Sequence, residues 1–408
     1  MAKNLYNNYV MKKNKAMSHF SFVCIQTIFR FVGYFFVGYR HKERYKIKKK
    51  EPIVVLCNHQ TDIDPILVNF SFTRLLRPLA TDNIFRKGII GKVVRKFGAI
   101  PKKKGMVDMA ATMEMMRVVN NNESLIIFPE GNRGYAEFQY FISIALAKLL
   151  KTMKKTVVIF NLHGGNGTRP RFKHKIRYGK FYGEIKKVLK YEDYKDMPNE
   201  ELLALVKDNL KVYDSESGEL YKSKIRAEYL ERMFFVCPAC NSTQTLYSKK
   251  ELITCQKCGF EAEFSEDLHL KVRNSEVKFT KLLDWYNYQK MWVKAFSCTG
   301  NEPIFWDENV RLFSSEVDKK KRLLAKGKIV LDSKNLTIGD QVFDLANIEV
   351  ASPVSGIKLC FTHKGNSYQV TGHDRFNPLK YMFMFNKLDT KIHQFNVDNY
   401  FTLEEEIS

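Results

Sequence analysis

The chain has 408 residues, of which 45% are hydrophobic and 13% aromatic, so it belongs to the globular class rather than the disordered one. Its 67 Lys and Arg outnumber its 44 Asp and Glu, and a formal net charge of +23 favours phosphate-bearing partners. At about 150 residues per domain, two or three domains are expected. Four of the eight cysteines are clustered and four are scattered, which excludes a disulfide scaffold and favours a reducing compartment that faces the cytosol.

An aromatic and apolar segment at residues 20–39 is expected to contact a membrane. Gln26 and Arg30 interrupt it, and lysines and arginines flank it on both sides. An arginine at mid-bilayer costs about 2.5–3.5 kcal/mol, so we expect residues 1–45 to lie at an anionic membrane surface, on the cytoplasmic face, as a peripheral or monotopic anchor. A buried amphipathic helix and a true membrane span are the alternatives.

Residues 46–215 alternate strand-like and helix-like stretches, a pattern typical of an α/β domain with a mixed, largely parallel sheet flanked by helices. Continuous apolar runs predict buried strands at 53–57, 124–128 and 156–160. Helices are expected at 65–70, 88–97, 106–119, 137–153 and 202–210. The linker candidate is 214–218, and a linker helix is expected at 216–233.

The first strand leads directly into His59 and, five residues further on, Asp64. Such a pair suits general-base chemistry, in which the imidazole takes a proton from an alcohol and the carboxylate fixes its tautomer. No nucleophilic side chain is needed if the alcohol attacks a thioester directly, so we expect Cys57 to be a core residue. Alternatively, Asp64 caps the helix that starts at Pro65, and His59 is a structural loop histidine.

A second polar loop, residues 129–134, follows the strand at 124–128. Gly131 lets the backbone approach a ligand closely. Arg133 offers a planar fork for two phosphate oxygens, and Glu130 orients that Arg or accepts from a substrate hydroxyl. The alternative is an ordinary turn. Because parallel strands end at one sheet edge, we expect both loops to line a single cleft.

The motifs Asn58-His59 to Asp64-Pro65 and Phe128 to Arg133 resemble the first and third blocks of the glycerophospholipid acyltransferases, of the lysophosphatidate (1-acylglycerol-3-phosphate) acyltransferase type. The resemblance covers about residues 20–215, with 98–104 in the place of the second block. It implies that His59 is the base and Asp64 its partner. The substrate-binding residues that we assign with it are Asn58, Glu130, Gly131, Asn132, Arg133, Lys102, Lys103 and Lys104. For the three lysines, a solvated basic face is the alternative.

The sequence departs from this family at three places. Lys104 or a neighbour stands where the second block ends in Arg, and Asn132 and Gly134 stand where Thr and Ser are usual. The strand at 156–160 lacks the usual Pro and leads to His163 beside a glycine-rich loop, where His163 either lines the cleft or is structural. These departures bear on the acceptor rather than on the reaction.

The resemblance implies an enzyme of phospholipid biosynthesis that moves a fatty acyl group from a thioester to the glycerol hydroxyl of a lysophospholipid, most simply 1-acylglycerol-3-phosphate. Acyl-coenzyme A or acyl carrier protein is the expected co-substrate, and an acidic carrier protein would suit the positive charge. No catalytic cofactor is expected. The alternatives are another lysolipid or glycolipid acceptor, and a non-catalytic binding protein built on an acyltransferase-like shell.

Residues 234–265 contain two C-x2-C pairs whose spacing predicts one structural Zn2+ in a zinc ribbon. The four expected ligands are Cys237, Cys240, Cys255 and Cys258. Asn241 and Gly259 follow the pairs and tolerate the positive φ that such turns need. Two disulfides are the alternative. We do not expect nucleic acid as a partner, because few aromatic residues are interleaved with the lysines.

The rest of the chain is expected to form a helical connector at 266–305, with an aromatic helix at 280–296, and a β-rich domain at 306–390. Six short strands are predicted there, at 309–313, 327–331, 336–338, 342–345, 357–361 and 367–371. Asn377 opens a closing helix that runs to residue 388. This pattern resembles a pleckstrin-homology-like barrel, and residues 391–408 form a tail.

Overall fold

The computed structural model describes residues 16–32, 34, 38–48, 50–81, 84–85, 88–102, 108–173, 175–298, 300, 302–315, 321–354 and 356–388. They form two compact units, each described by itself here. The first unit takes in the chain up to Gly134, together with Ile142–Thr168 and Tyr178–Asp214, and the second takes in Tyr135–Phe141, Arg169–Arg177 and the chain from Ser215 onward. Lys103, Lys104 and the tail at 391–408 lie outside the described residues.

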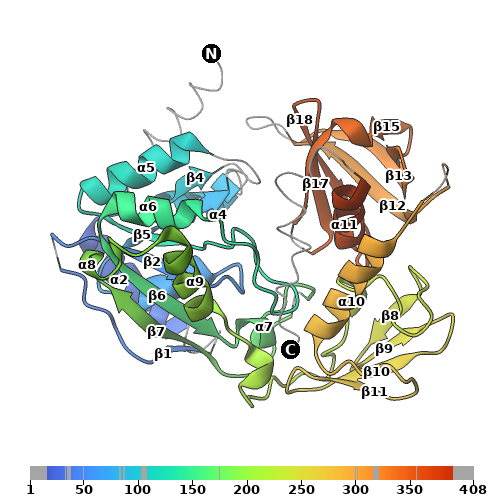
Figure 1. Cartoon of the computed structure of the whole chain (residues 1–408), viewed down its shortest axis with the longest axis horizontal. Coiled ribbons are helices and arrows are strands. Elements are labelled where there is room, and N and C mark those ends of the chain that lie inside the picture. Colours follow the sequence, from blue (N-terminus) through green and yellow to red (C-terminus); the bar gives the residue numbers. More distant parts are fainter. Residues whose placement is uncertain are drawn as a thin grey trace. The chain divides into compact units, whose positions relative to one another are not determined.

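The first unit is built on a seven-stranded sheet in the order β1-β7-β6-β2-β5-β3-β4 (Figure 1). Its strands are β1 Tyr39–His41, β2 Ile53–Cys57, β3 Leu76–Thr81, β4 Ile100–Lys102, β5 Ser124–Ile127, β6 Thr156–His163 and β7 Phe181–Leu189. Neighbouring strands are parallel except β6 and β7, which are antiparallel. The predicted mixed, largely parallel sheet is therefore confirmed.

Helices pack on both faces of this sheet. They are α2 His19–Val32, α3 Asp64–Phe70, α4 Gly88–Lys96, α5 Met109–Asn120, α6 Ala145–Met153, α7 Gly165–Thr168, α8 Tyr191–Tyr194 and α9 Asn199–Leu210. Val54 and Leu56 of β2 join a core with residues of α5, α6 and α9. Val55 and Cys57 point to the other face and join a core with residues of α3. Burial on both faces explains why β2 is a continuous apolar run.

One local prediction in this part of the chain was wrong, and four strands were missed. The helix expected at 137–153 begins only at Ala145, because Glu137 has a left-handed φ of +59° and residues 135–141 belong to the second unit. Strands β1, β3, β4 and β7 were not predicted, and in β7 the third residue, Gly183, weakens the strand pattern. A Cβ at Gly183 would clash with the Tyr39 hydroxyl and the Phe160 ring, so the sheet needs glycine there.

The aromatic N-terminal segment contains α2, which packs against α3 through Gln26. Gln26 Nε2 donates to the carbonyl oxygens of Asn69 and Phe72, both at 2.8 Å, and Arg44 Nη2 donates to Gln26 Oε1 at 2.6 Å. Gln26 thus faces the protein and is 2% exposed, whereas Phe20 on the same helix is 79% exposed. Within the described residues, no helix is long and apolar enough to cross a membrane.

The second unit holds two antiparallel sheets. The smaller, in the order β11-β10-β9-β8, has β8 Leu246–Lys249, β9 Leu252–Cys255, β10 Glu261–Phe264 and β11 Leu270–Val272. The predicted aromatic helix is α10 Leu282–Ala295. The helix expected at 216–233 is wrong: these residues, all described, contain only a short 3-10 turn at Leu230–Arg232 after the one at Asp214–Glu216. Tyr221 and Leu230 of this segment are instead buried in the core of the unit.

The larger sheet has seven strands in the order β15-β14-β13-β12-β18-β17-β16. They are β12 Phe305–Ser314, β13 Leu323–Leu331, β14 Asn335–Ile338, β15 Gln341–Asp344, β16 Ile348–Val354, β17 Lys358–His363 and β18 Asn366–Thr371. The unpredicted β16 contains Pro353, which an edge strand tolerates. Asn377 caps α11 Pro378–Leu388, because its Oδ1 accepts from the N–H groups of Leu379 and Lys380. A β-rich C-terminal domain with one closing helix is confirmed.

Candidate functional site

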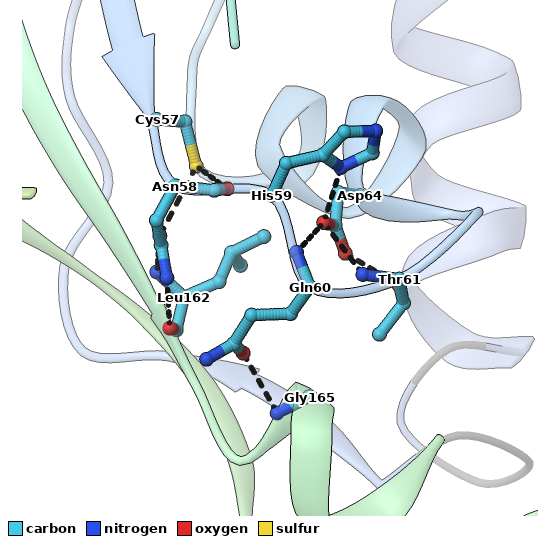
Figure 2. Close-up of polar contacts among 8 residues, drawn as sticks. All are labelled: Cys57, Asn58, His59, Gln60, Thr61, Asp64, Leu162 and Gly165. Carbon is cyan, nitrogen blue, oxygen red and sulfur yellow. Dashed lines mark hydrogen bonds and ion pairs between the residues drawn. The ribbon is translucent and has the colours of Figure 1, made fainter. Parts of the chain in front are cut away.

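His59 and Asp64 lie on the loop and helix that follow β2, and they contact each other (Figure 2). His59 Nδ1 lies 2.9 Å from Asp64 Oδ2. The same oxygen accepts from the backbone N–H groups of Gln60 at 2.7 Å and Thr61 at 2.8 Å, and the Thr61 hydroxyl donates to Oδ1. A carboxylate with these donors accepts only, so Nδ1 carries a proton and the neutral imidazole presents an unprotonated Nε2.

Asp64 is not an N-cap. The helix α3 begins at Asp64 itself, and Ile63 occupies the N-cap position without a side-chain hydrogen bond. The carboxylate, which is fully buried, points back to the loop that carries His59. Of the two interpretations of Asp64, the geometry therefore favours the partner of His59.

Cys57 is a core residue, as predicted. Its side chain is fully buried at the end of β2, and its Sγ lies 3.2 Å from the carbonyl oxygen of Asn58. Burial raises the pKa of the Cys57 thiol well above its ordinary value, and the charges of Asp64 and Glu130 raise it further. A thiol in such a place supplies little thiolate and is a poor nucleophile.

The loop that follows β5 contacts the loop of His59. The Gly134 N–H donates to the His59 carbonyl oxygen at 3.2 Å, and the Phe128 ring centroid lies 4.4 Å from that of His59. Gly131 has a φ of +65°, and its N–H closes a turn on the Phe128 carbonyl at 3.0 Å. The loop also carries three half-buried polar residues, Glu130, Asn132 and Arg133. The two polar loops thus lie side by side at the carboxyl ends of adjacent parallel strands.

Asn58 connects the first loop to β6. Its Nδ2 donates to the Leu162 carbonyl at 2.9 Å, and its Oδ1 accepts from the Leu162 N–H at 2.8 Å (Figure 2). Both ends of the amide are engaged by backbone, so Asn58 stabilises the loop, and its contact with a substrate stays a prediction. Lys102 is exposed at the end of β4. Lys103 and Lys104, which follow it, lie outside the described residues.

The glycine-rich loop after β6 binds a carboxylate of the protein itself. Asp214, which is 1% exposed, accepts from the N–H groups of Gly164 at 2.6 Å and Asn166 at 3.0 Å. The Gly165 N–H donates to Gln60 Oε1 at 2.9 Å. The glycine-rich loop therefore stabilises the loop of His59 through Gln60. Sequence reasoning missed Gln60 altogether and placed Asp214 only in a linker.

His163 contacts β7 beside this loop. Its ring stacks on Tyr182, with centroids 4.7 Å apart, and its Nε2 lies 3.0 Å from Glu184 Oε1. Burial lowers the pKa of the His163 imidazole, although the charge of Glu184 opposes that effect. The contacts of this side chain are with the β6–β7 pair, which favours the structural interpretation.

Comparison with known proteins bears on this geometry. Residues 38–158 match the family model described as Acyltransferase. The chain therefore carries a domain of the acyltransferase family. The matched residues include both polar loops. A crystal structure of the 1-acyl-sn-glycerophosphate (LPA) acyltransferase PlsC from Thermotoga maritima is similar over 51% of this chain and 86% of that chain, with 15% identity and a TM-score of 0.39. A search of curated proteins gives no match.

Outside the acyltransferase domain, four cysteine thiols lie within 4.8 Å of one another. The Sγ atoms of Cys237 and Cys258 are 3.7 Å apart, and those of Cys240 and Cys255 are 3.8 Å apart. Ligands at about 2.3 Å in a tetrahedron are about 3.8 Å from one another, whereas disulfide sulfurs are about 2.05 Å apart. The four thiols therefore fit a tetrahedral metal ion and not two disulfides.

The turns after the two cysteine pairs have the predicted backbone. Asn241 has a φ of +59° and Gly259 one of +75°. Their N–H groups donate to the carbonyl oxygens of Cys237 and Cys255, at 3.0 Å and 2.9 Å. Each pair is thus presented by a tight turn, which brings both of its thiols to one side.

Proposed function

We propose that this protein transfers a fatty acyl group from an acyl thioester to the glycerol hydroxyl of a lysophospholipid, with 1-acylglycerol-3-phosphate as acceptor and phosphatidate as product. The observation that carries the proposal is the contact between His59 Nδ1 and Asp64 Oδ2 within a domain of the acyltransferase family. The His59 side chain is 20% exposed, so a ligand can reach its ring.

His59 acts as the general base in this reaction. Its Nε2 takes the proton of the acceptor hydroxyl while Asp64 stabilises the imidazolium that develops. The hydroxyl oxygen attacks the thioester carbonyl, and collapse of the tetrahedral intermediate breaks the carbon–sulfur bond. The departing thiolate takes the proton back from the imidazolium, so the base is restored. No metal ion or covalent acyl-enzyme is required by these steps.

The second loop supplies the acceptor site in this proposal. Arg133 binds the acceptor phosphate as a planar fork, Gly131 allows close approach of the backbone, and Glu130 orients the Arg or the hydroxyl. The half-buried position of Glu130 and Arg133 beside the His59 loop supports this assignment. Asn132 completes the site, with the lysines at 102–104 attracting phosphate of the acceptor or of coenzyme A.

The remaining proposals concern the surroundings of the reaction. The acyl donor is acyl-coenzyme A or an acyl carrier protein, and the protein works at the cytoplasmic face of an anionic membrane, with the exposed side of α2 in the headgroup region. The four clustered thiols hold one Zn2+. Since all four positions are taken by thiolates, that ion has no open coordination position and is structural.

The experiment that tests the reaction measures thiol release from palmitoyl- and oleoyl-coenzyme A by the purified full chain in liposomes. The acceptors are lysophosphatidate, a zwitterionic lysophospholipid and a lysoglycolipid, with His59→Ala alongside. Thiol release that requires lysophosphatidate supports the proposal. Release with another acceptor alone would show that the protein is an acyltransferase with a different acceptor. No release with any acceptor, from coenzyme A or carrier-protein thioesters, would favour a binding protein on an acyltransferase-like shell.

A further inference from the structure

The loop of His59 is connected to a distant part of the first unit by Gln60. The Gln60 N–H donates to Asp64 Oδ2 at 2.7 Å, and its side chain accepts from the Gly165 N–H at 2.9 Å. Its Nε2 donates to Asp214 Oδ2 at 3.2 Å. Gln60 is 4% exposed. Gln60 therefore connects Asp64, the partner of His59, to the carboxylate of Asp214, which lies 154 positions after Gln60 in the sequence.

The Asp214 carboxylate accepts hydrogen bonds from both loops. Its Oδ1 accepts from the Gly164 N–H, and its Oδ2 accepts from both the Asn166 N–H and Gln60 Nε2. A buried carboxylate is costly unless donors surround it, and these three donors come from two different loops. The carboxylate thus joins the glycine-rich loop to the loop of His59.

The two loops are also in van der Waals contact, and glycine is required at that contact. A Cβ built on Gly165 would lie 2.7 Å from the Gln60 Cβ and 3.0 Å from the Thr61 Cγ2. Gln60 and Thr61 supply the two backbone N–H groups that bind Asp64. A shift of the glycine-rich loop would therefore move the donors that position Asp64.

We infer that Asp214 is a positioning residue for the acyl-transfer reaction, because through Gln60 it maintains the loop geometry in which Asp64 binds Nδ1 of His59. The inference rests on the proposed function. In Asp214→Asn, either orientation of the amide turns its NH2 toward a backbone N–H, that of Gly164 or that of Asn166, so one donor loses its acceptor and the glycine-rich loop shifts against Gln60. A misplacement of about 1 Å near a reacting group costs about 10²-fold in rate, and we expect kcat to fall about 10- to 100-fold.

The kinetic test uses the purified full chain and Asp214→Asn, together with the following variants. Gln60→Glu places a second carboxylate against Asp214, and the double variant Gln60→Glu/Asp214→Asn restores a donor and acceptor between the two positions with the roles exchanged. The matched control is Asp208→Asn, because Asp208 on α9 is 68% exposed and forms a surface ion pair with Lys211. Each variant is assayed for kcat and KM of thiol release and for its thermal midpoint.

A second readout does not need activity. In protein labelled with 15N-histidine, the ring nitrogens of His59, assigned by their absence in His59→Gln, report its tautomer. We expect the Nδ1–H form in the natural protein and in Asp208→Asn, and a mixture of tautomers in Asp214→Asn and Gln60→Glu. The double variant should recover part of both the tautomer and kcat, with KM within about threefold throughout.

The outcomes separate this inference from the proposed function. If the natural protein shows no acyl transfer, the tautomer alone decides whether Asp214 positions His59. The inference is overturned if Asp214→Asn leaves the tautomer and kcat unchanged. It is also overturned if kcat falls only in proportion to the folded fraction, with the tautomer of the folded protein intact, because Asp214 would then be merely structural.

Discussion

The Asp64 carboxylate lies 2.9 Å from His59 Nδ1, and the N–H groups of Gln60 and Thr61 bind the same carboxylate oxygen. Gln60 and Thr61, which lie between His59 and Asp64 in the sequence, thus supply the N–H groups that orient the Asp64 carboxylate toward the His59 ring. This geometry defines which ring nitrogen of His59 is available as a base, and the first prediction follows from it.

Asp64→Asn should lower kcat by about 10²–10⁴-fold, because a neutral amide cannot stabilise the imidazolium charge that develops on His59 as the carboxylate does. KM for the thioester should stay within about threefold, since the side chain is buried away from the substrate. Steady-state thiol release checks both values. An unchanged kcat in a fully folded variant would exclude Asp64 as the partner of the base.

The clustered thiols should bind one Zn2+ per chain, and Cys240→Ser should lose it. Trp285 reports on the site, because its Nε1 donates to the carbonyl of Val236, next to Cys237, at 2.9 Å. We expect metal analysis to find one zinc in the natural protein, and a strong chelator to change the tryptophan fluorescence. Cys298→Ser, outside the cluster, is the control and should keep the metal. Zinc retained by Cys240→Ser would contradict the assignment.

Lys290→Met should stabilise the second unit at pH 7. Lys290 on α10 is 1% exposed, its Nζ has no hydrogen-bond partner among the described residues, and it lies 4.0 Å from the Phe138 ring centroid. Burial lowers the pKa of Lys290 to about 8 from its ordinary 10.5. The unfolded chain therefore binds more protons between these two values, and the stability of the natural protein rises as pH rises through that window.

The stabilisation by Lys290→Met should be about 1–3 kcal/mol at pH 7, after the cation–π contact is discounted, and should shrink toward pH 10. Tryptophan fluorescence during urea unfolding measures the free energy of unfolding of the second unit. The three tryptophans of the chain, Trp285, Trp292 and Trp306, all belong to that unit. A variant that is less stable at pH 7, or whose difference does not depend on pH, would disprove this account of Lys290.

Phe20→Asp should weaken binding to vesicles of phosphatidylcholine and phosphatidylglycerol by about 10-fold or more, because removing one inserted aromatic side chain loses about 1.5–3 kcal/mol. Phe20 is 79% exposed on α2. Val342→Asp is the matched control, since Val342 is 62% exposed on β15 of the second unit and should not affect binding. Co-sedimentation measures both, and equal binding by the natural protein and Phe20→Asp would place the membrane contact elsewhere.

Local sequence signals were enough for the parts of the structure that depend on short-range patterns. The runs that became β2, β5 and β6 are buried on both faces of the sheet, and such burial leaves a continuous apolar signature. The cysteine spacing likewise predicted four thiols at one point. His59 and Asp64 could be paired because the strand end, the loop length and the helix start bring them together locally.

Long-range contacts explain what the sequence could not reveal. Asp214 lies in a polar stretch typical of a linker, and only the tertiary fold brings it to Gln60. The glycine that makes β7 hard to recognise is required by Tyr39 and Phe160, which come from other strands. The assignment of residues 135–141 and 169–177 to the second unit also depends on packing partners far along the chain.

The most direct test of the central claim is the rate of phosphatidate formation from oleoyl-coenzyme A and lysophosphatidate, measured for the natural protein and for His59→Ala at equal concentrations of folded protein. The account predicts product from the natural protein and a rate about 10²–10⁴-fold lower from the variant. Equal rates of phosphatidate formation by the two proteins would contradict the assignment of His59 as the base.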